Sequence, residues 1–439
     1  ATVDVNTKPI SNAAASAVYA FDGKLPNEYI EDNAISRFII YSNTLDNVDS
    51  LAKLTSLTEL DLYDTKLTNV NGLTGLTHVG TFYLNYVPTL TNIDGLSNIA
   101  SFGPEAYIDH NITLTNVDGL SGLVTANLLD LQHNALTNVD GLSSLTTTAQ
   151  FNLNNNNLNN VNGLSSLTST SDFYLQSNSI TTIAGLSALT TVGELDLSNN
   201  NLSTIDGLQS LTSSTYLNFT SNQLTSLAGI ASIGNINAAK SLFAPSNNLS
   251  NLSGLEAMVT ADDLDFSYNP LTDISGLTNL VTVSGSLAIS NGGTLTNVDG
   301  LNSLTTAPTL SVTDHALTNL DGLSGLTSAT YLSFYNNQLT NVNGLSGITS
   351  VYSLSLRNNK LSDLDGLSNL TSLNFIELQS NPFLTSVSGL RNLASANSVK
   401  LDAITYLVRA PAASPFCQAI GTTVTLATGY AVKSDVCEP

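Results

Sequence analysis

A seven-residue phrase that contains glycine recurs along the whole chain. It reads LTNVDGL at 114–120, 136–142 and 295–301, and close variants occupy 67–73 and 317–323. From Ser50 through the fifteen glycines between Gly72 and Gly389, ten of the fifteen intervals are 22 residues long and the others are 23 to 25. A repeat of this length predicts a solenoid of stacked coils instead of a single globular core.

Two leucines alternate with other residues ahead of each glycine phrase. Leu195 and Leu197 show this pattern, which has the period of a β-strand with both leucines on its buried face. The later pair Asp206 and Gly207 predicts a turn, because Asp suits turns and Gly adopts backbone angles closed to other residues. We therefore predict an α/β-type solenoid of about 16–17 coils, with a parallel sheet on the concave face and turns and short 3-10 segments on the convex face.

An asparagine stands two places before the third leucine of most repeats. A buried amide can both donate to and accept from the backbone of neighbouring coils, whereas a buried carboxylate carries a desolvation cost. The asparagines at this place are Asn43, Asn134, Asn156, Asn178, Asn200, Asn222, Asn247, Asn269, Asn337 and Asn359. Other repeats are expected to be locally irregular: those with Thr65 or His315 at this place, and those with insertions near Pro88, Ile112, Gly293 and Pro382.

The L-x-L-x-x-N-x-L core resembles the leucine-rich repeat family over roughly residues 38–401. The 22-residue length and the phrase L-T-N-V-D-G-L are similar to those of the bacterial internalin-like branch, which usually has a proline where this chain has the glycine. The resemblance implies a leucine-rich repeat arc. It says less about function, because one fold hosts many functions.

The two ends depart from the repeat and are predicted to be caps. Residues 1–37 would form an N-terminal cap, residues 38–401 the solenoid, and residues 402–439 a C-terminal cap. Both cysteines of the chain, Cys417 and Cys437, lie in the last segment. Two cysteines in a terminal cap suggest a disulfide that staples a segment with little core of its own, and two free thiols are the alternative.

The composition limits which binding partners and which cellular location we expect for the chain. Thirty-four acidic against twelve basic residues give a net charge of −22, which disfavours nucleic acid and anionic membranes as partners. No apolar run is long enough to predict a membrane span. The chain begins at Ala1 without Met or a signal segment, consistent with a processed secreted protein or a recombinant form, and an extracellular location is expected. Without G-x-S-x-G, H-E-x-x-H or P-loop sequences, we expect neither catalysis nor a cofactor.

The outward residues of the strands vary while the leucines stay constant, and variation on a rigid concave sheet is what a recognition surface requires. In the N-terminal half, tyrosines among aspartates would offer flat apolar anchors in an acidic field, which suits a basic protein patch or a glycan. Simple tolerance of tyrosine on an exposed sheet is the alternative. The candidate binding residues are Asp61, Tyr63, Tyr83, Tyr107, Asp109, Asp130, Tyr174 and Asp196.

Three further columns each have two interpretations. His110 and His133 occupy equivalent places in adjacent repeats and are either a weak metal pair or two solvated side chains. The aspartate before the glycine, as at Asp118 and Asp140, either binds cations such as calcium or serves the turn. The threonine after the third leucine, as at Thr137, either forms a regular lattice for ice or for another copy, or caps neighbouring backbone groups.

Three functional hypotheses follow. The first is a secreted or cell-surface, non-enzymatic binding and adhesion scaffold that recognises a protein or glycan through the concave face. The second is an extracellular structural protein that self-assembles into a filament or surface layer. The third is an ice-binding protein that uses the threonine column. Variation on the outward strand positions favours the first.

Overall fold

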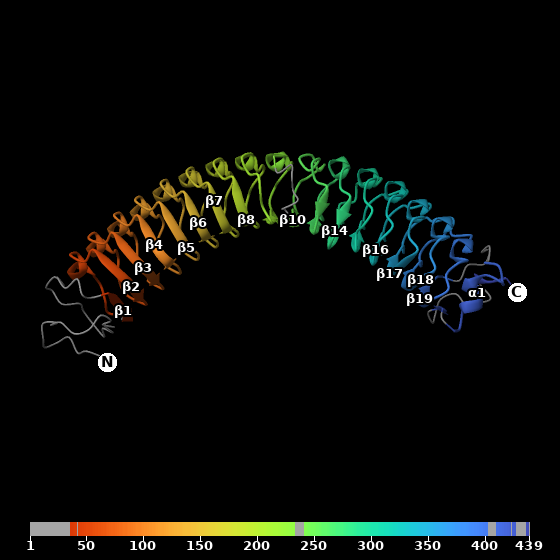
Figure 1. Cartoon of the computed structure of the whole chain (residues 1–439), viewed down its shortest axis with the longest axis horizontal. Coiled ribbons are helices and arrows are strands. Elements are labelled where there is room, and N and C mark those ends of the chain that lie inside the picture. Colours follow the sequence, from red (N-terminus) through yellow and green to blue (C-terminus); the bar gives the residue numbers. More distant parts are fainter. Residues whose placement is uncertain are drawn as a thin grey trace. The chain divides into compact units, whose positions relative to one another are not determined.

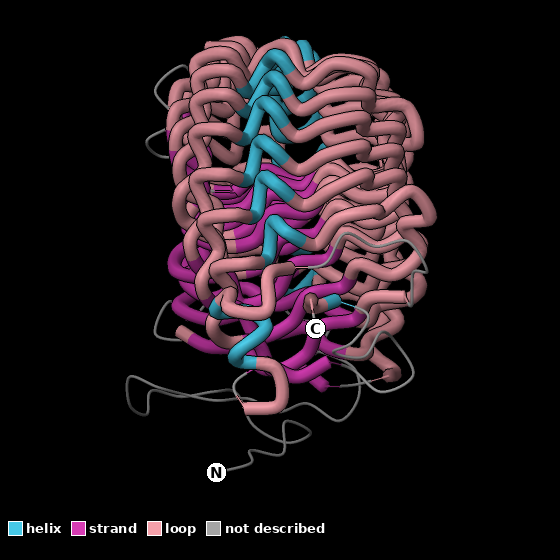
Figure 2. Tube along the Cα trace, turned by 90° about the vertical axis from the view of Figure 1, so that its right-hand side faces the viewer, coloured by secondary structure: helices cyan, strands magenta, loops and turns pink. Residues whose placement is uncertain are grey.

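The computed structural model describes residues 36–41, 43–232, 241–402, 410–422, 424–426 and 436–438. The chain divides into two compact units, Ala1–Asn218 (unit 1) and Phe219–Pro439 (unit 2). Within each unit the repeats follow one another as successive coils (Figure 1). The strands and the 3-10 helices line up in separate rows on opposite sides of the coils (Figure 2). The predicted N-terminal cap falls almost wholly outside the described residues.

The sheet of unit 1 consists of nine strands, each parallel to the next along the chain. They are β1 (Arg37–Tyr41), β2 (Ser56–Tyr63), β3 (His78–Asn85), β4 (Ser101–Tyr107), β5 (Thr125–Asp130), β6 (Thr147–Asn152), β7 (Ser169–Tyr174), β8 (Thr191–Asp196) and β9 (Tyr216–Asn218). Its 3-10 helices are η1 (Asp49–Leu51), η2 (Asn71–Leu73), η3 (Asp94–Leu96), η4 (Asp118–Leu120), η5 (Asp140–Leu142), η6 (Asn162–Leu164), η7 (Ala184–Leu186) and η8 (Asp206–Leu208).

Unit 2 continues the same pattern, and its strands are again parallel. They are β10 (Ser241–Phe243), β12 (Asp263–Asp265), β14 (Ser286–Ala288), β15 (Thr309–Ser311), β16 (Tyr331–Ser333), β17 (Ser350–Ser355), β18 (Ser372–Glu377), β19 (Ala396–Lys400) and β20 (Val424–Leu426), with β11 (Thr260–Ala261) and β13 (Thr282–Val283) as a separate pair. The helical segments are η9 (Ala228–Ile230), η10 (Ser275–Leu277), η11 (Asp299–Leu301), η12 (Asp321–Leu323), η13 (Asn343–Leu345), η14 (Asp365–Leu367), η15 (Ser388–Leu390) and α1 (Pro415–Ala419). The predicted solenoid, with its 3-10 segments opposite the strands, is confirmed.

The core of each coil is apolar and continuous with that of its neighbours. Leu195 and Leu197 of one coil are completely buried, as the alternating pattern predicts. Phenylalanine replaces the first leucine in adjacent strands β6 and β7, where the rings of Phe151 and Phe173 stack with centroids 4.9 Å apart. Because each coil covers the apolar side of the next, burial of these side chains stabilises the stack and not the single repeat.

The repeated glycine is required for a reason other than the predicted one. Among the described repeat glycines only Gly254 has a positive φ, of 107°, and the others lie in ordinary 3-10 geometry. A Cβ on Gly185 would instead overlap the carbonyl oxygen of Val161 in the preceding coil. Close approach of backbone to backbone, and not backbone freedom, therefore explains the glycine of LTNVDGL.

Buried asparagines join successive coils by hydrogen bonds, as predicted. Oδ1 of Asn200 accepts from the backbone N–H of Ile180 over 3.0 Å, and its Nδ2 donates to the carbonyls of Leu175 and Leu197, both at 3.1 Å. The same three contacts recur around Asn156 and, in unit 2, around Asn359. Each amide satisfies backbone groups that would otherwise be buried without partners.

The repeats with insertions depart less from this pattern than expected. Asn111 and Asn381 occupy the same buried place and make the same type of contact with the preceding coil. Irregularity remains as register shifts on both sides of β4. Asn43, in contrast, is exposed, so its predicted burial is wrong.

Histidine replaces asparagine in one coil of unit 2. His315 is buried, and its Nδ1 accepts from the backbone N–H of Leu295 at 3.4 Å. Burial lowers its pKa, which keeps Nδ1 available as an acceptor. The larger ring fits because the preceding coil has Gly292, where a Cβ would overlap the imidazole.

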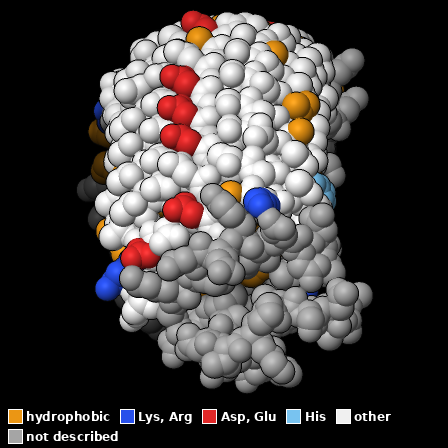
Figure 3. All heavy atoms as spheres, turned by 90° about the vertical axis from the view of Figure 1, so that its left-hand side faces the viewer, with side chains coloured by type: hydrophobic (Ala, Val, Ile, Leu, Met, Phe, Trp, Pro, Cys, Tyr) orange, Lys and Arg blue, Asp and Glu red, His pale blue; other side chains and the backbone are white. Residues whose placement is uncertain are grey.

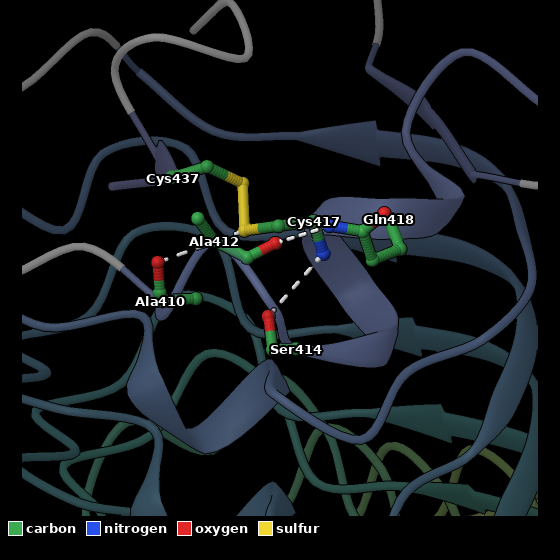
Figure 4. The surroundings of a disulfide bond; sticks show 6 residues. All are labelled: Ala410, Ala412, Ser414, Cys417, Gln418 and Cys437. Carbon is green, nitrogen blue, oxygen red and sulfur yellow. Dashed lines mark hydrogen bonds between the residues drawn. A yellow bond between two sulfur atoms is a disulfide. The ribbon is translucent and has the colours of Figure 1, made fainter. Parts of the chain in front are cut away.

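A disulfide joins Cys417 and Cys437 near the C-terminus, as predicted (Figure 4). Cys417 lies in α1, whose N-cap is Ser414, and the backbone N–H of Cys417 donates to the Ser414 hydroxyl at 3.4 Å. Gln418 ties the helix to the preceding segment by donating to the Ala412 carbonyl at 2.6 Å. The boundary of this cap at residue 402 stays a prediction. No helix among the described residues is long and apolar enough to cross a membrane.

The asparagine contacts make a stability prediction. Asn200→Ala should lower the free energy of unfolding by roughly 2–4 kcal/mol, because the Ile180 N–H and two carbonyls lose a buried partner. Chemical denaturation followed by circular dichroism measures this change. Thr204→Ala, at an exposed position of the same coil, is the control and should change stability by less than ~0.5 kcal/mol. Equal effects of the two substitutions would contradict the structural role of the amide.

Candidate functional site

The strand register of unit 1 places the outward residues that lie between the two strand leucines on one line of the sheet, the central column. Its members, each paired with the next, are Ile39, Asp61, Tyr83, Tyr107, Asp130, Asn152, Tyr174, Asp196 and Asn218. A second outward column follows two residues later, where Tyr63 pairs with Asn85 and Asp109 comes next. The structure therefore brings the eight candidate binding residues onto one face of unit 1, and their role in binding stays a prediction.

Tyr83 and Tyr107 form a stacked pair on neighbouring strands. Their ring centroids are 5.3 Å apart and the ring planes differ by 9°. The Tyr83 hydroxyl donates to Oε2 of Glu105 at 2.9 Å. Burial, together with this carboxylate, raises the pKa of Tyr83 to about 12, so the phenol remains a neutral donor at any physiological pH. The pair therefore forms a half-buried aromatic surface whose orientation is already fixed in the unbound protein.

Tyr174 repeats this arrangement three coils later. Its hydroxyl donates to Oε2 of Glu194 at 3.2 Å, and burial followed by nearby carboxylates raises its pKa to about 12. Beside Tyr174 lies a hollow of about 100 Å³ that includes Asp130 and Asn152 in its walls. Pockets for small molecules are usually about 300–1,000 Å³, so this part of the face suits a side chain of a larger partner better than a metabolite.

Asp61 and Asp196 are held by neighbouring side chains. Asp61 is buried and accepts from the Tyr41 hydroxyl at 2.7 Å. Burial raises the pKa of Asp61, and the hydrogen bond with Asp61 raises the pKa of Tyr41 to about 12. Asp196 accepts from the backbone N–H of Ser198 at 2.8 Å and from Nδ2 of Asn218 at 3.2 Å. Both carboxylates are thereby oriented and not free to move.

Asp109 and Asp130 are the other buried carboxylates of this face. Asp130 accepts from the backbone N–H of Gln132 at 3.0 Å and from its Nε2 at 2.9 Å. Burial, reinforced by the nearby Asp109 charge, raises the pKa of Asp130 to about 6 despite the opposing Gln132 hydrogen bonds. Oδ1 of Asp109 lies 2.9 Å from Nδ1 of His110, and burial raises the pKa of Asp109 although the imidazole opposes it.

No lysine or arginine occurs between Lys66 and Lys240, a stretch that contains ten Asp and Glu residues. Unit 2 differs, because its sheet face supplies its own cations. Arg357 lies 4.5 Å from the ring centroid of Tyr335, and Nζ of Lys400 lies 3.0 Å from Oε1 of Glu377. From β3 onward, the acidic face of unit 1 therefore has no basic side chain of its own to neutralise it, and a cationic partner would meet oriented carboxylates.

Sequence reasoning missed a third outward column, which lies just before the first strand leucine. In unit 1 it includes Glu59, Glu105, Asp172 and Glu194, paired in register along the sheet. Glu105 and Glu194 are the residues that orient the tyrosine hydroxyls. Their two-residue spacing from the central column was a signal in the sequence, since alternate strand residues share a face.

A row of aromatic rings lies at the end of the strands, and its members are Tyr41, Tyr63, Tyr86, His110 and His133. Successive ring centroids are 5.6, 5.3, 4.4 and 4.6 Å apart. The last three residues have φ values of 58°, 56° and 52°, in the left-handed region that such residues seldom adopt. The same position has a positive φ in coils without a ring, as at Asn155 and Asn199, so the repeat sets this conformation and each ring packs on its neighbour within it.

His110 and His133 are thus brought together, but as members of this stack. Among the described residues no group of three or more His, Cys, Asp or Glu side chains could hold a metal ion. Face-to-face imidazoles 4.6 Å apart account for their equivalent positions through packing. The arrangement favours the interpretation of two surface side chains over that of a metal pair.

The threonine column caps backbone groups, in agreement with the simpler of its two interpretations. The Thr91 hydroxyl donates to the Thr68 carbonyl at 2.9 Å, and the Thr340 hydroxyl donates to the Thr318 carbonyl at 3.3 Å. These hydroxyls are thereby engaged within the solenoid.

The aspartates before the glycine begin the 3-10 helices η1, η3, η4, η5 and η8 in unit 1. Figure 3 shows an interrupted row of acidic side chains on the surface, as expected for an aspartate that recurs only in some coils. The backbone N–H of Asp140 is capped by Oδ1 of Asn138 at 3.1 Å, so the N-x-D part of the phrase is a turn motif.

Comparison with known repeats decides the family. The family model of the BspA type leucine rich repeat region matches six copies, over residues 23–123, 131–250 and 260–383. The chain belongs to the BspA type leucine-rich repeat family. The resemblance to leucine-rich repeats is confirmed, and the matching type of repeat is the BspA type.

Solved structures similar to this BspA type repeat protein include an internalin (inlF) from Listeria monocytogenes, with 24% sequence identity and a TM-score of 0.49 over 67% of this chain and 86% of that one. A leucine-rich repeat protein from Leptospira interrogans shows 21% identity and a TM-score of 0.48 over 77% of this chain and 90% of that one. No curated protein matches the sequence. The family assignment rests on the repeat model and not on these likenesses.

The environment of Asp130 makes a pH-dependent prediction. In the unfolded chain an aspartate titrates near 3.9, whereas in the folded protein the pKa of Asp130 is about 6. Between these values the folded state binds the extra proton, so stability should rise as pH falls from about 7 to about 4. Asp130→Asn should therefore stabilise the protein by about 1–2 kcal/mol at pH 7 and by much less near pH 4, as measured by denaturant unfolding at both pH values. If Asp130→Asn changed the free energy of unfolding equally at both pH values, the burial of this charge would be contradicted.

Proposed function

We propose that this protein is a non-enzymatic extracellular scaffold that binds a protein partner through the outward face of the sheet in unit 1. The observation that carries the proposal is the stacked pair Tyr83 and Tyr107, fixed among oriented carboxylates. Partly exposed aromatic rings with little freedom to reorganise are typical of residues that dominate protein interfaces. The constant inward leucines and variable outward positions suit such a surface.

A positively charged patch is the partner chemistry that this face fits. Between residues 67 and 239 there is no lysine or arginine, and six carboxylates lie on the sheet face and create a field of one sign: Glu105, Asp109, Asp130, Asp172, Glu194 and Asp196. Such a field raises the rate at which an oppositely charged partner docks and suppresses acidic ones. The tyrosine rings would then provide apolar contact area once the partner has arrived.

An extracellular location agrees with the Cys417–Cys437 disulfide, since disulfides persist in oxidising compartments. Ice binding is less favoured, because the threonine hydroxyls that it would use donate to backbone carbonyls of the preceding coil. Nothing in the described part of the chain favours self-assembly over recognition.

The proposal is tested by comparing the proteins that are retained by the wild type, by a variant of this face and by a control variant of unit 2. Immobilised wild-type protein, the double variant Tyr83→Ala/Tyr107→Ala and the control Ser333→Ala would be exposed to surface and secreted proteins at physiological salt. We expect at least one protein that the wild type and the control retain equally and that the double variant retains roughly tenfold less, as quantified by mass spectrometry.

Two results would contradict the proposal. One is that no retained protein distinguishes the double variant from the control. The other is that retention does not weaken as salt is raised from about 0.05 to 0.5 M, since attraction between exposed charges is screened over this range. Ser333 is a suitable control because it occupies the equivalent central position of a strand in unit 2.

A further inference from the structure

A groove of about 430 Å³ lies in unit 2, where strands β17 and β18 begin. Its walls include Thr330, Ser350, Tyr352, Ser372, Asn374 and Ser395. The volume lies within the range of about 300–1,000 Å³ that is usual for ligand sites. Every polar side chain in these walls is neutral, so no Asp, Glu, Lys, Arg or His among the described residues lines the groove.

Several of these polar groups are not hydrogen-bonded within the described part of the protein. Among the residues that the structure describes, the Asn374 side-chain amide and the hydroxyls of Thr330 and Ser395 have no hydrogen-bond partner. The hydroxyls of Ser350 and Ser372 lie 3.0 Å apart and share one hydrogen bond, which leaves each further capacity. The groove therefore presents a mixture of donors and acceptors without charge.

Three exposed rings flank this groove. Tyr352 belongs to its wall, and its ring centroid lies 5.3 Å from that of Tyr331 and 5.7 Å from that of Phe375. The three side chains retain 43%, 46% and 40% of their full exposure, respectively, which is unusual for neighbouring large aromatic residues. A cluster of exposed rings beside free hydroxyls and an amide offers apolar faces and polar edges together.

We propose that this groove binds an uncharged oligosaccharide. A sugar ring has an apolar face of C–H groups, which packs on an aromatic ring, and a rim of hydroxyls, each of which both donates and accepts. The neutral Asn, Ser and Thr side chains match that rim, and Tyr352 offers the ring. A phosphorylated or sulfated ligand would find no counter-charge in the walls and would meet a protein of net charge −22.

This site is independent of the proposed function, since its residues lie outside unit 1. The test is isothermal titration of the full chain with a panel of hexasaccharides: cellohexaose, maltohexaose, xylohexaose, mannohexaose and chitohexaose, with a heparin hexasaccharide as the acidic comparison. At least one uncharged hexasaccharide should bind with a dissociation constant between roughly 10 μM and 1 mM. Tyr352→Ala should weaken it at least about tenfold, and Asn374→Ala at least about fivefold.

Two controls separate binding from folding. Tyr352→Phe keeps the ring and should remain within about threefold of the wild type, whereas Tyr268→Ala removes an exposed tyrosine that does not line the groove and should leave the affinity unchanged. If Tyr352→Ala lowers the melting temperature, its loss of affinity could come from unfolding, and the affinity of Asn374→Ala is then used as the test of binding.

The proposal is overturned if no uncharged hexasaccharide binds at about 5 mM, if the heparin hexasaccharide binds more tightly than all of them, or if Tyr268→Ala abolishes binding as fully as Tyr352→Ala.

Discussion

The contact on which the whole structure depends is the hydrogen bonding of each coil to the one before it. Hydrogen bonds between parallel strands pair the backbone groups on one side of the coil. The buried asparagine amides pair the backbone groups of the turn that follows, as Asn200 does for Ile180 and Leu175. The glycine of the repeated phrase lets successive coils approach this closely, because a side chain at Gly185 would overlap the Val161 carbonyl of the coil before. A single repeat has none of these partners, so it cannot hold its shape alone. Close backbone stacking thus accounts for both the constant asparagine and the constant glycine.

Stacking of this kind leaves the outward side chains free to change. Inward positions must fill the same apolar space in every coil, whereas outward positions need only tolerate a paired neighbour 22 or more residues away. Unit 1 uses this freedom to accumulate carboxylates, three of which are buried at Asp61, Asp109 and Asp130. Buried acids with raised pKa values oppose folding at neutral pH, so their retention is easier to understand on a surface that binds something than on an inert one.

The two units present different chemistry on the same scaffold. The face of unit 1 combines stacked tyrosines with negative charge, while the groove of unit 2 combines exposed aromatic rings with neutral hydroxyls and an amide. Near the end of the sheet of unit 2, Lys400 pairs with the Glu377 carboxylate, whereas Asp263 and Asp265 of β12 accept hydrogen bonds from Ser286 and Ser267. Burial would raise the pKa of Glu377, but the hydrogen bonds from Lys400 and Ser355 outweigh it and lower the pKa. Similar residues therefore have different electrostatic states, depending on which cations the neighbouring coils supply.

The sequence by itself determined the solenoid, the parallel register and the central column of unit 1, because a strict period places equivalent residues side by side. The two cysteines lie outside that period, and the sequence left a disulfide and two free thiols as alternatives. It also placed the buried asparagines, apart from exposed Asn43, half-buried Asn178 and the unforeseen Asn111 and Asn381. Only the tertiary structure decided why the glycine is needed, that Tyr83 and Tyr107 stack, that Glu105 and Glu194 orient tyrosines, and that a neutral groove opens beside Tyr352. These features depend on ring orientation, burial and distances of a few ångströms between coils, and a period in the sequence carries no information about them.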